Sequence, residues 1–308
     1  MSPLKPDLVP LIVCPACHSD LKVEVTRRER VEIEEGSLNC TKCGALYPIR
    51  CGIPRFVTSD LYVRSFSAEW NIFSRTQLDH GRFGYTRETF IKLVGMKPEM
   101  VHGIILEAGC GMGRFLDVVS RSPRATIVGF DLSLAVEAAY KNVGGRPNVH
   151  IVQADIVQPP FRVEGFDLVY SLGVLHHTNN PKEAFLKLVP LLKRRGEIAI
   201  WVYHKYRRPP LSDFYRIFTS RMPWSMVLGI CRFLSKLHRL QERCRYLLVL
   251  IPTSTLSDSE RRILDTFDWY SPKYQFKFTN GEVIVWFKEA GLHQIQILSN
   301  PVSIKGKK

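Results

Sequence analysis

Five short apolar runs alternate with helical patterns between residues 103 and 203, and this alternation constrains the fold more than any other feature of the chain. The runs are Ile104–Glu107, Thr126–Asp131, Val149–Ala154, Phe166–Ser171 and Glu197–Tyr203. Strands that alternate with helices form βαβ units, whose parallel sheet binds ligands beyond the carboxyl ends of its strands. We therefore expect an α/β fold built on a Rossmann-like, mostly parallel sheet.

A glycine-rich loop follows the first of these runs, in the sequence Glu107-Ala-Gly109-Cys-Gly111-Met-Gly113. Dinucleotide-binding enzymes use Gly-x-Gly-x-x-Gly, which sets a pyrophosphate at a helix N-terminus. Here the third glycine comes one residue early, and an acidic residue precedes the loop. This spacing favours a ligand that carries an ammonium group and no phosphate.

Acidic residues also stand at the next two strand ends. Asp131 closes the second run, where a carboxylate can accept hydrogen bonds from both ribose hydroxyls, and Asp155 follows the third, at the place for an adenine amino group. Taken singly, each acid is more often a helix cap or a solvated strand end. Together, at three consecutive strand ends, they favour a nucleoside site.

With these motifs in place, the central region resembles class I S-adenosylmethionine (SAM)-dependent methyltransferases of the broad group that includes ubiquinone and menaquinone biosynthesis enzymes. The resemblance implies SAM as cofactor and an antiparallel pair of strands at the C-terminal edge of the sheet. The residues that it places on SAM are Glu107, Gly109, Gly111, Gly113, Asp131, Leu132, Asp155, Ile156 and Ser171.

Two histidines, His176 and His177, follow the fourth run and are the candidate catalytic residues. Methyl transfer needs in-line positioning, and it needs a base only when the acceptor must lose a proton. His177 is the preferred base or acceptor-positioning group. The alternative is that both histidines only orient the backbone near the cofactor.

Two Cys-x2-Cys motifs near the N-terminus, Cys14/Cys17 and Cys40/Cys43, have the spacing of a four-thiolate zinc site. Four thiolates leave no open coordination position, so we expect a structural Zn²⁺ that stabilises a small domain over residues 1–58. Cys51 lies outside the pattern and is expected to be a packed thiol. The arrangement resembles the zinc ribbons of methyltransferase activator subunits.

Aromatic segments flank the central region. Residues 59–102 are expected to form helices that cover the cofactor, with Trp70 and Tyr85 at the substrate side. The SAM domain is expected over 103–308, with a helical and aromatic lid inserted at 204–278. Its candidate substrate residues are Trp269, Tyr270 and Tyr274. For all these rings, packing between helix and sheet is the alternative.

The insertion also predicts a basic amphipathic helix. Residues 204–308 hold 18 basic against 8 acidic side chains, whereas residues 1–58 hold 8 against 7. Four of the basic side chains form one stripe, at Arg232, Lys236, Arg239 and Arg243, opposite an apolar face. This pattern is typical of a lid with a solvated face, or of a segment over 226–251 that contacts an anionic amphiphile or a membrane surface.

Three functions fit these features. The first is a SAM-dependent methyltransferase that acts on a small molecule, either apolar or anionic, of lipidic, prenylated or natural-product type. The second is an rRNA or tRNA methyltransferase, disfavoured because residues 1–58 have a charge balance of only +1 and the basic stripe adjoins an apolar face. The third is a non-catalytic SAM-binding partner protein. The N-terminus shows no apolar signal segment, and eight cysteines suit a reducing compartment, so we expect a cytoplasmic protein.

Overall fold

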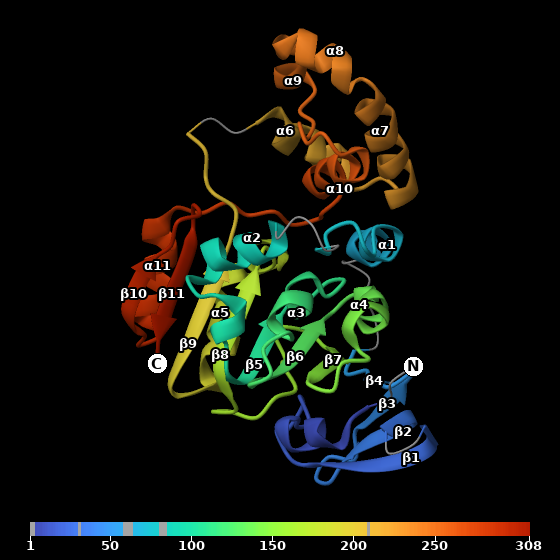
Figure 1. Cartoon of the computed structure of the whole chain (residues 1–308), viewed down its shortest axis with the longest axis vertical. Helices are drawn as coiled ribbons and strands as arrows, with labels where there is room; N and C mark the ends of the chain where they lie inside the picture. The colour runs from blue at the N-terminus through green and yellow to red at the C-terminus, as the bar shows by residue number, and fades with distance from the viewer. Residues whose placement is uncertain (1–3, 30–31, 58–63, 80–84, 208–209) are drawn as a thin grey trace.

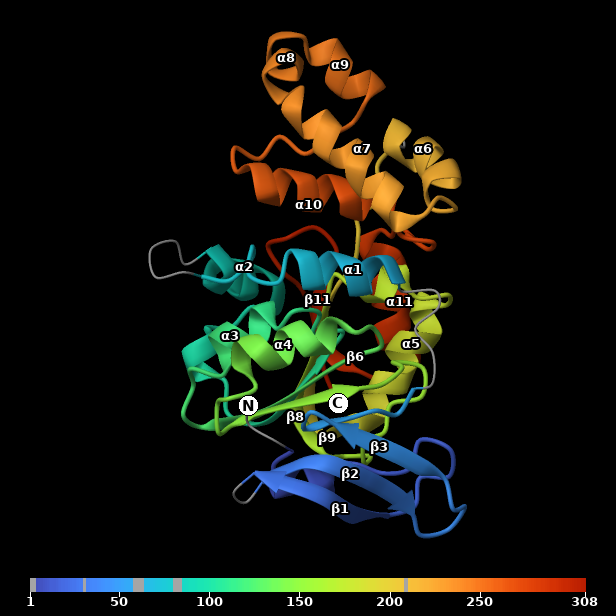
Figure 2. The ribbon, with the colours of Figure 1, turned by 90° about the vertical axis from the view of Figure 1, so that its right-hand side faces the viewer.

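The computed structural model describes residues 4–29, 32–57, 64–79, 85–207 and 210–308. A small antiparallel sheet lies at one end of the molecule, a larger sheet covered by helices lies in the middle, and a group of helices lies at the other end (Figures 1 and 2). The three parts follow one another along the long axis.

The central sheet has seven strands in the order β10-β11-β9-β8-β5-β6-β7. Their bounds are β5 Gly103–Ala108, β6 Ala125–Asp131, β7 Val149–Gln153, β8 Phe166–Leu172, β9 Leu192–Trp201, β10 His293–Ile297 and β11 Ser303–Lys307. The five strands from β5 to β9 pair in parallel, and β11 pairs antiparallel with both β9 and β10. The predicted Rossmann-like sheet with an antiparallel C-terminal hairpin is confirmed.

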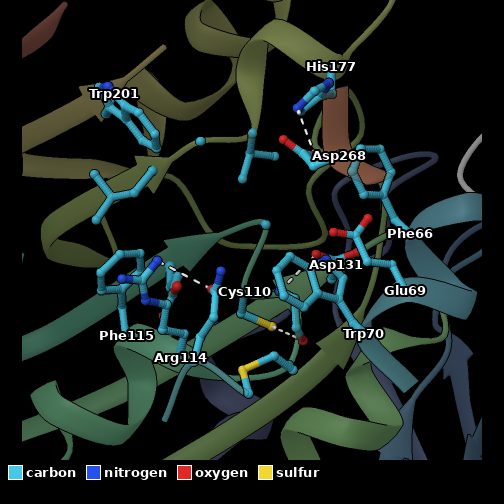
Figure 3. Close-up of a pocket in the computed structure, with 18 of the residues that line it drawn as sticks. Phe66, Glu69, Trp70, Cys110, Arg114, Phe115, Asp131, His177, Trp201 and Asp268 are labelled. Carbon is cyan, nitrogen blue, oxygen red and sulfur yellow. Dashed lines mark hydrogen bonds and ion pairs between the residues drawn. The ribbon is translucent and has the colours of Figure 1, made fainter. Parts of the chain in front are cut away.

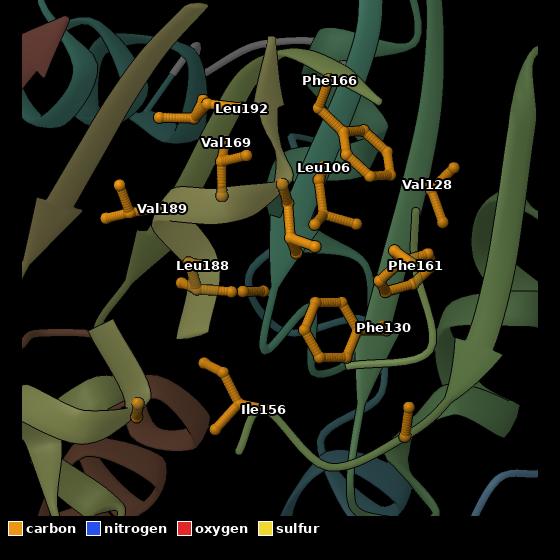
Figure 4. Packing of buried hydrophobic residues seen from close by; sticks show 14 of the residues in the cluster. Leu106, Val128, Phe130, Ile156, Phe161, Phe166, Val169, Leu188, Val189 and Leu192 are labelled. Atoms are coloured by element: carbon orange, nitrogen blue, oxygen red, sulfur yellow. The ribbon is translucent and has the colours of Figure 1, made fainter. Parts of the chain in front are cut away.

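Helices cover both faces of this sheet because its strands are apolar on both sides. The helices of the domain are α1 Arg64–Ile72, α2 Tyr85–Val94, α3 Arg114–Val119, α4 Ala135–Val143, α5 Pro181–Leu188 and α11 Asn280–Glu289. Ile105 and Ile127 belong to the core with α2, α3 and α4. Their neighbours Leu106 and Val128 belong to the opposite core, which also holds Phe161 (Figure 4).

The N-terminal sheet contains β1 Leu21–Glu29, β2 Glu32–Cys40, β3 Leu46–Arg50 and β4 Ile53–Pro54, all antiparallel. Its apolar residues join the core on one face of the central sheet. The Val13 amide donates to the Pro160 carbonyl at 2.9 Å, and the Phe56 amide donates to the Gln153 carbonyl at 2.8 Å. The small sheet is therefore docked through both backbone and core contacts.

The insertion after β9 differs from the predicted single amphipathic helix. It contains α6 Leu211–Thr219, α7 Trp224–Lys236, α8 His238–Arg243, α9 Arg245–Leu250 and α10 Ser259–Tyr270. The backbone leaves the α-helical region at Leu237, so Arg232 and Lys236 lie on α7 while Arg243 lies on α8. The side chain of Arg239 falls outside what the structure describes. In the described segments, no helix is long and apolar enough to cross a membrane.

Two local predictions also have clear outcomes. The capping box of Thr279 and Glu282 forms as expected at the start of α11. The sequence predicts that the helix starting at Pro181 ends at Gly196, with a kink or an early stop at Pro190, and the early stop is the one that forms. Because Pro190 cannot continue a helix, α5 ends at Leu188, and Gly196 lies inside β9 at an irregular step of its pairing with β8.

Candidate functional site

A cavity of about 550 Å³ lies beyond the carboxyl ends of the central strands. The ends of β5, β6 and β8 form its floor, and α1 and α10 lie over it, where Phe73, directly after α1, shares a core with Leu264 and Phe267 of α10. Figure 3 shows side chains from these elements converging on the same space. This is the edge of the sheet at which the sequence predicts a ligand.

The glycine-rich loop forms part of the floor. Gly109 has a φ of +81°, and an added Cβ would lie 2.4 Å from Val174, so only glycine fits there. Beneath the loop, the Tyr170 hydroxyl donates to Glu107 at 2.9 Å. Burial raises the pKa of Glu107 well above its ordinary value. The loop thus leaves room for a ligand above it, with a buried carboxyl group at its base.

Asp131, at the end of β6, organises the neighbouring wall. One of its oxygens accepts from the Gly111 amide at 2.9 Å, and the other accepts from the amide and hydroxyl of Ser133 at 2.8 and 2.7 Å. Burial raises its pKa despite these hydrogen bonds. The same carboxylate therefore lines the cavity and fixes the glycine loop.

Most of the residues predicted for the site line this cavity. They are Glu107, Gly109, Gly111, Asp131, Leu132, Asp155, Ile156, His177, Trp70 and Tyr85. A Cβ added to Gly111 would lie 3.4 Å from the indole Nε1 of Trp70, so this ring covers the loop.

Six predicted residues do not line it: Gly113, Ser171, His176, Trp269, Tyr270 and Tyr274. Gly113 lies where α3 approaches Ala139 of α4, and the Ser171 hydroxyl donates to the Ala108 carbonyl between strands. His176 is fully buried and stacks on Tyr203, with ring centroids 3.9 Å apart. These three residues serve packing.

The three aromatic residues of the insertion are placed by packing inside it or beside it. Tyr270 and Trp269, at the end of α10, belong to the core that holds Cys231, and the Tyr270 hydroxyl donates to the Pro252 carbonyl. The ring of Tyr274 stacks on Phe276. The lid thus places a different face of α10 over the cavity, the one with Asp265 and Asp268.

His177 is the predicted catalytic histidine that does reach the cavity. Its Nδ1 lies 2.9 Å from the Tyr274 carbonyl, which can only accept, so this nitrogen carries the proton. Its Nε2 lies 3.7 Å from Asp268, which also accepts a hydrogen bond from the Tyr203 hydroxyl. Burial lowers the pKa of His177, although the charge of Asp268 opposes this effect. A neutral imidazole with a free Nε2 can accept a proton.

The cavity also contains charged residues that sequence reasoning did not single out: the acids Glu69, Asp265 and Asp268, and the bases Lys92, Arg114 and Arg261. Glu69 and both oxygens of its carboxyl group are buried without a partner, and Nη2 of Arg114 is likewise buried without one. The signal for Glu69 is its spacing, because it shares the face of α1 that carries Phe66 and Phe73. A carboxylate on an apolar helical face calls for an explanation.

The four N-terminal cysteines form a second site. The sulfur atoms of Cys14, Cys17, Cys40 and Cys43 all lie within 4.8 Å of one another. Tetrahedral Zn²⁺ with bonds of 2.3 Å places its sulfurs about 3.8 Å apart. The Cys14–Cys43 and Cys17–Cys40 sulfur distances are 3.7 and 3.3 Å. The set is thus compatible with a structural zinc ion.

The surroundings of the four cysteines also favour metal binding. The amides of Lys42 and Cys43 point at the Cys40 sulfur from 3.4 Å and lower the pKa of its thiol, which favours the thiolate that binds metal. Cys51 lies outside the cluster, and it is exposed rather than packed as expected, because it sits in a turn with a φ of +50°.

Two protein families match this chain. Residues 5–52 match the family described as "Trm112p-like protein", and residues 106–200 match the family described as "Methyltransferase domain". The chain carries a Trm112p-like domain and a class I methyltransferase domain. The glycine loop, Asp131 and His177 all belong to the matched part of the methyltransferase domain, whereas Glu69 and α10 lie outside it.

The relatives of the methyltransferase domain differ in what they act on. A malonyl-[acyl-carrier protein] O-methyltransferase of Legionella pneumophila is 37% identical over 94 residues, 30% of this chain and 33% of that protein. A tRNA U34 carboxymethyltransferase of Vibrio parahaemolyticus is 32% identical over 100 residues, 31% of each chain. Phosphoethanolamine N-methyltransferase 3 of Arabidopsis thaliana is 25% identical over 53% of this chain and 33% of that protein. The chain thus spans about a third of the length of these relatives.

Solved structures of methyltransferases are also similar. Human N-acetylserotonin methyltransferase in complex with SAM is 14% identical, with a TM-score of 0.49, over 82% of this chain and 60% of that one. A complex of the Haloferax volcanii Trm112 methyltransferase activator with a methyltransferase is 14% identical, with a TM-score of 0.45, over 78% of this chain and 79% of that one.

Proposed function

We propose that this protein is a SAM-dependent methyltransferase that acts on a small molecule enclosed in the cavity. The observation that carries the proposal is the convergence of Glu107, Gly109, Asp131 and Asp155 on one cavity of about 550 Å³. That volume falls within the usual range for small-molecule sites. SAM supplies a methyl group on a positively charged sulfur, and the residues of the chain bind and orient the two substrates.

The residues fit SAM part by part. Asp131 takes the ribose hydroxyls, while Asp155 and Ile156 take the adenine. The space above Gly109 takes the methionine part, with Glu107 at its base. We assign the SAM carboxylate to Arg114, whose Nη2 lacks a partner, because a buried guanidinium is stabilised by an anion.

A small acceptor is favoured because α10 closes the cavity. Leu264, Asp265 and Asp268 of α10 face Phe66 and Trp70 of α1 across the space that remains. A lid of this kind narrows the approach to the cavity and suits a compact acceptor, whereas a nucleotide within a folded RNA needs a wider opening. In this site His177 is the group that accepts a proton or positions the acceptor.

Methylation of RNA is the second candidate, since several relatives of the methyltransferase domain are tRNA enzymes. Their likeness covers about a third of this chain and 31% and 24% of the two relatives. The Trm112p-like domain, which could hold RNA, has a nearly even balance of charge. A non-catalytic SAM-binding role is the third, and it is disfavoured because the cavity extends beyond the proposed cofactor residues to His177 and Asp268.

The insertion supports a contact with an anionic membrane surface. Exposed apolar side chains gather on α6 and α7, at Phe214, Phe218, Trp224, Met226, Ile230 and Phe233. Residues 211–250 hold seven basic against two acidic side chains. Apolar side chains among basic ones are typical of helices that lie on anionic bilayers. We propose this contact as a way to approach membrane-associated acceptors from the cytoplasm.

Binding of SAM and of its product S-adenosylhomocysteine (SAH) tests the proposed activity. Calorimetry on the purified protein should give saturable binding of both with one equivalent. Incubation with methyl-labelled SAM and the small molecules of a cell extract should then yield a labelled compound of low mass. Label in RNA instead would favour the second candidate, and failure to bind SAM would exclude the proposal.

A further inference from the structure

Three carboxyl groups line one part of the cavity and influence one another's charge. Glu69 comes from α1, and Asp265 and Asp268 come from successive turns of α10. Figure 3 shows the Glu69 and Asp268 carboxyl groups directed into the space beside Phe66 and His177. Glu69 is 1% exposed, and neither of its oxygens has a hydrogen-bond partner. A buried carboxyl group without a partner is costly unless a ligand satisfies it.

The pKa values of these carboxyl groups also indicate that a ligand is needed to stabilise their charged forms. Burial raises the pKa of Glu69 well above its ordinary value, and the charges of Asp268 and Asp265 raise it further. Burial and the charge of Asp268 also raise the pKa of Asp265 to about 6, although the nearby charges of Arg114 and Arg261 oppose this rise. These acids disfavour one another's ionised forms, and a positive charge placed between them would reverse that effect.

We propose that the acceptor of the methyl group is an amine, and that Glu69, with Asp265 and Asp268, binds it as an ammonium ion. This inference rests on the proposed methyltransferase function and adds the chemical class of the acceptor. It also replaces the anionic acceptor expected from the sequence, because an anion would be repelled by this side of the cavity.

Other ligands suit the three carboxyl groups less well. Among the described residues, only the four cysteines of the Trm112p-like domain form a group of three or more ligands close enough to hold one metal ion. A neutral alcohol brings no positive charge that would stabilise the ionised form of these carboxyl groups. The rings of Phe66, Trp70 and Trp201 also line the cavity, and aromatic faces attract organic cations.

The chemistry balances with these groups. The bound ammonium gives one proton to the Glu69 carboxylate or to Nε2 of His177, which leaves a neutral amine. The nitrogen lone pair then forms the N–C bond to the methyl group while the S–C bond breaks. Its electron pair stays on sulfur, so the products are SAH and a methylated ammonium ion. A carboxyl group with a raised pKa is a suitable proton acceptor for this step.

Three probes of similar size test the inference: phenethylamine, 2-phenylethanol and phenylacetate. Ligand-observed NMR on the SAH-bound protein at neutral pH should show binding of the amine in preference to the other two. Glu69→Gln should weaken the binding of phenethylamine roughly 10-fold to 100-fold, the loss expected for a hydrogen bond to a charged group. Glu88→Gln, which changes an exposed glutamate of α2, should leave it unchanged.

Parallel titrations with SAM and SAH separate the acceptor site from the cofactor site. If Glu69 binds the acceptor, Glu69→Gln leaves the affinities for both nearly unchanged. If the Glu69 carboxylate instead binds the positively charged sulfur of SAM, the variant loses affinity for SAM but not for SAH. That result overturns the inference. Preference for phenylacetate or 2-phenylethanol, or no binding of the amine, also overturns it. Asp268→Asn is a second test should Glu69→Gln fail to fold.

Failure of the proposed function would look different. The wild-type protein would then bind neither SAM nor SAH, and the three probes on the ligand-free protein would still report the charge that the cavity prefers. An amine preference under those conditions would support the cation site and reject the methyl transfer. No preference would reject both.

Discussion

The Arg55 guanidinium donates to Oε1 of Gln153 at 2.9 Å, which joins the segment directly after β4 to the edge strand β7 of the methyltransferase domain. The amide of the same Gln153 side chain donates to the Leu132 carbonyl at 3.0 Å. Leu132 follows Asp131 and lines the cavity. Two hydrogen bonds through Gln153 therefore connect Arg55 with Leu132, the neighbour of Asp131 in the proposed ribose site.

Replacing Arg55 should therefore affect both stability and cofactor binding. Arg55 also pairs with Glu137 at 3.3 Å, and it is almost fully buried. Arg55→Ala removes a buried charged hydrogen bond and should lower the free energy of unfolding by about 1.5–3 kcal/mol, with weaker SAM binding. Thermal unfolding and calorimetry measure the two effects. Arg50→Ala, at an exposed position of β3, is the control.

Removal of the metal should destabilise the docked domain. We expect one zinc equivalent, bound by Cys14, Cys17, Cys40 and Cys43, since metal binding and folding are coupled in small domains of this kind. Cys40→Ser should lower both the zinc content and the melting temperature. Cys51→Ser should change neither. Metal analysis that finds no zinc in freshly purified protein would contradict the prediction.

Substitution of Asp131 tests the cofactor assignment. Asp131→Ala should weaken SAM binding roughly 10-fold to 100-fold, because it removes charged hydrogen bonds to the ribose. Asp131→Asn keeps the shape and should retain part of the contact with the glycine loop. Unchanged affinity in calorimetry would show that the ribose lies elsewhere.

The stability of the ligand-free protein should depend on pH through Asp265. Its pKa is about 6 in the folded state, against an ordinary value of 3.8. Between these values the folded protein binds more protons than the unfolded chain, so the free energy of unfolding falls as pH rises. The loss through this group is about 3 kcal/mol at most. In denaturant titrations from pH 4 to pH 7, Asp265→Asn should show a smaller decrease than wild type.

The basic residues of α7 should govern contact with lipid. Arg232→Ala combined with Lys236→Ala should weaken the free energy of binding to anionic liposomes by about 1 kcal/mol per residue, so that less protein sediments with them. The affinity for SAM should stay constant. Unchanged sedimentation would show that these side chains only face water. A steep salt dependence of RNA binding that the variant reduces would instead indicate an RNA surface.

The sequence alone determined the sheet, the glycine loop and the cysteine cluster. Each depends on local pattern: alternating apolar runs, a loop that only glycine can form at Gly109, and paired cysteines at fixed spacing. Polar residues at strand ends, such as Asp131 and Asp155, could be placed because parallel strands end at a common edge of the sheet. These features need no knowledge of which distant segments meet.

Tertiary structure alone decided what surrounds the acceptor. Glu69 and Asp268 are about two hundred positions apart in the chain, and they share a cavity only because α10 packs on α1. The break at Leu237 likewise divides a basic stripe that looks continuous in the sequence. The physical reason is that packing between distant segments selects which face of a helix is buried, whereas periodicity specifies only that a face exists.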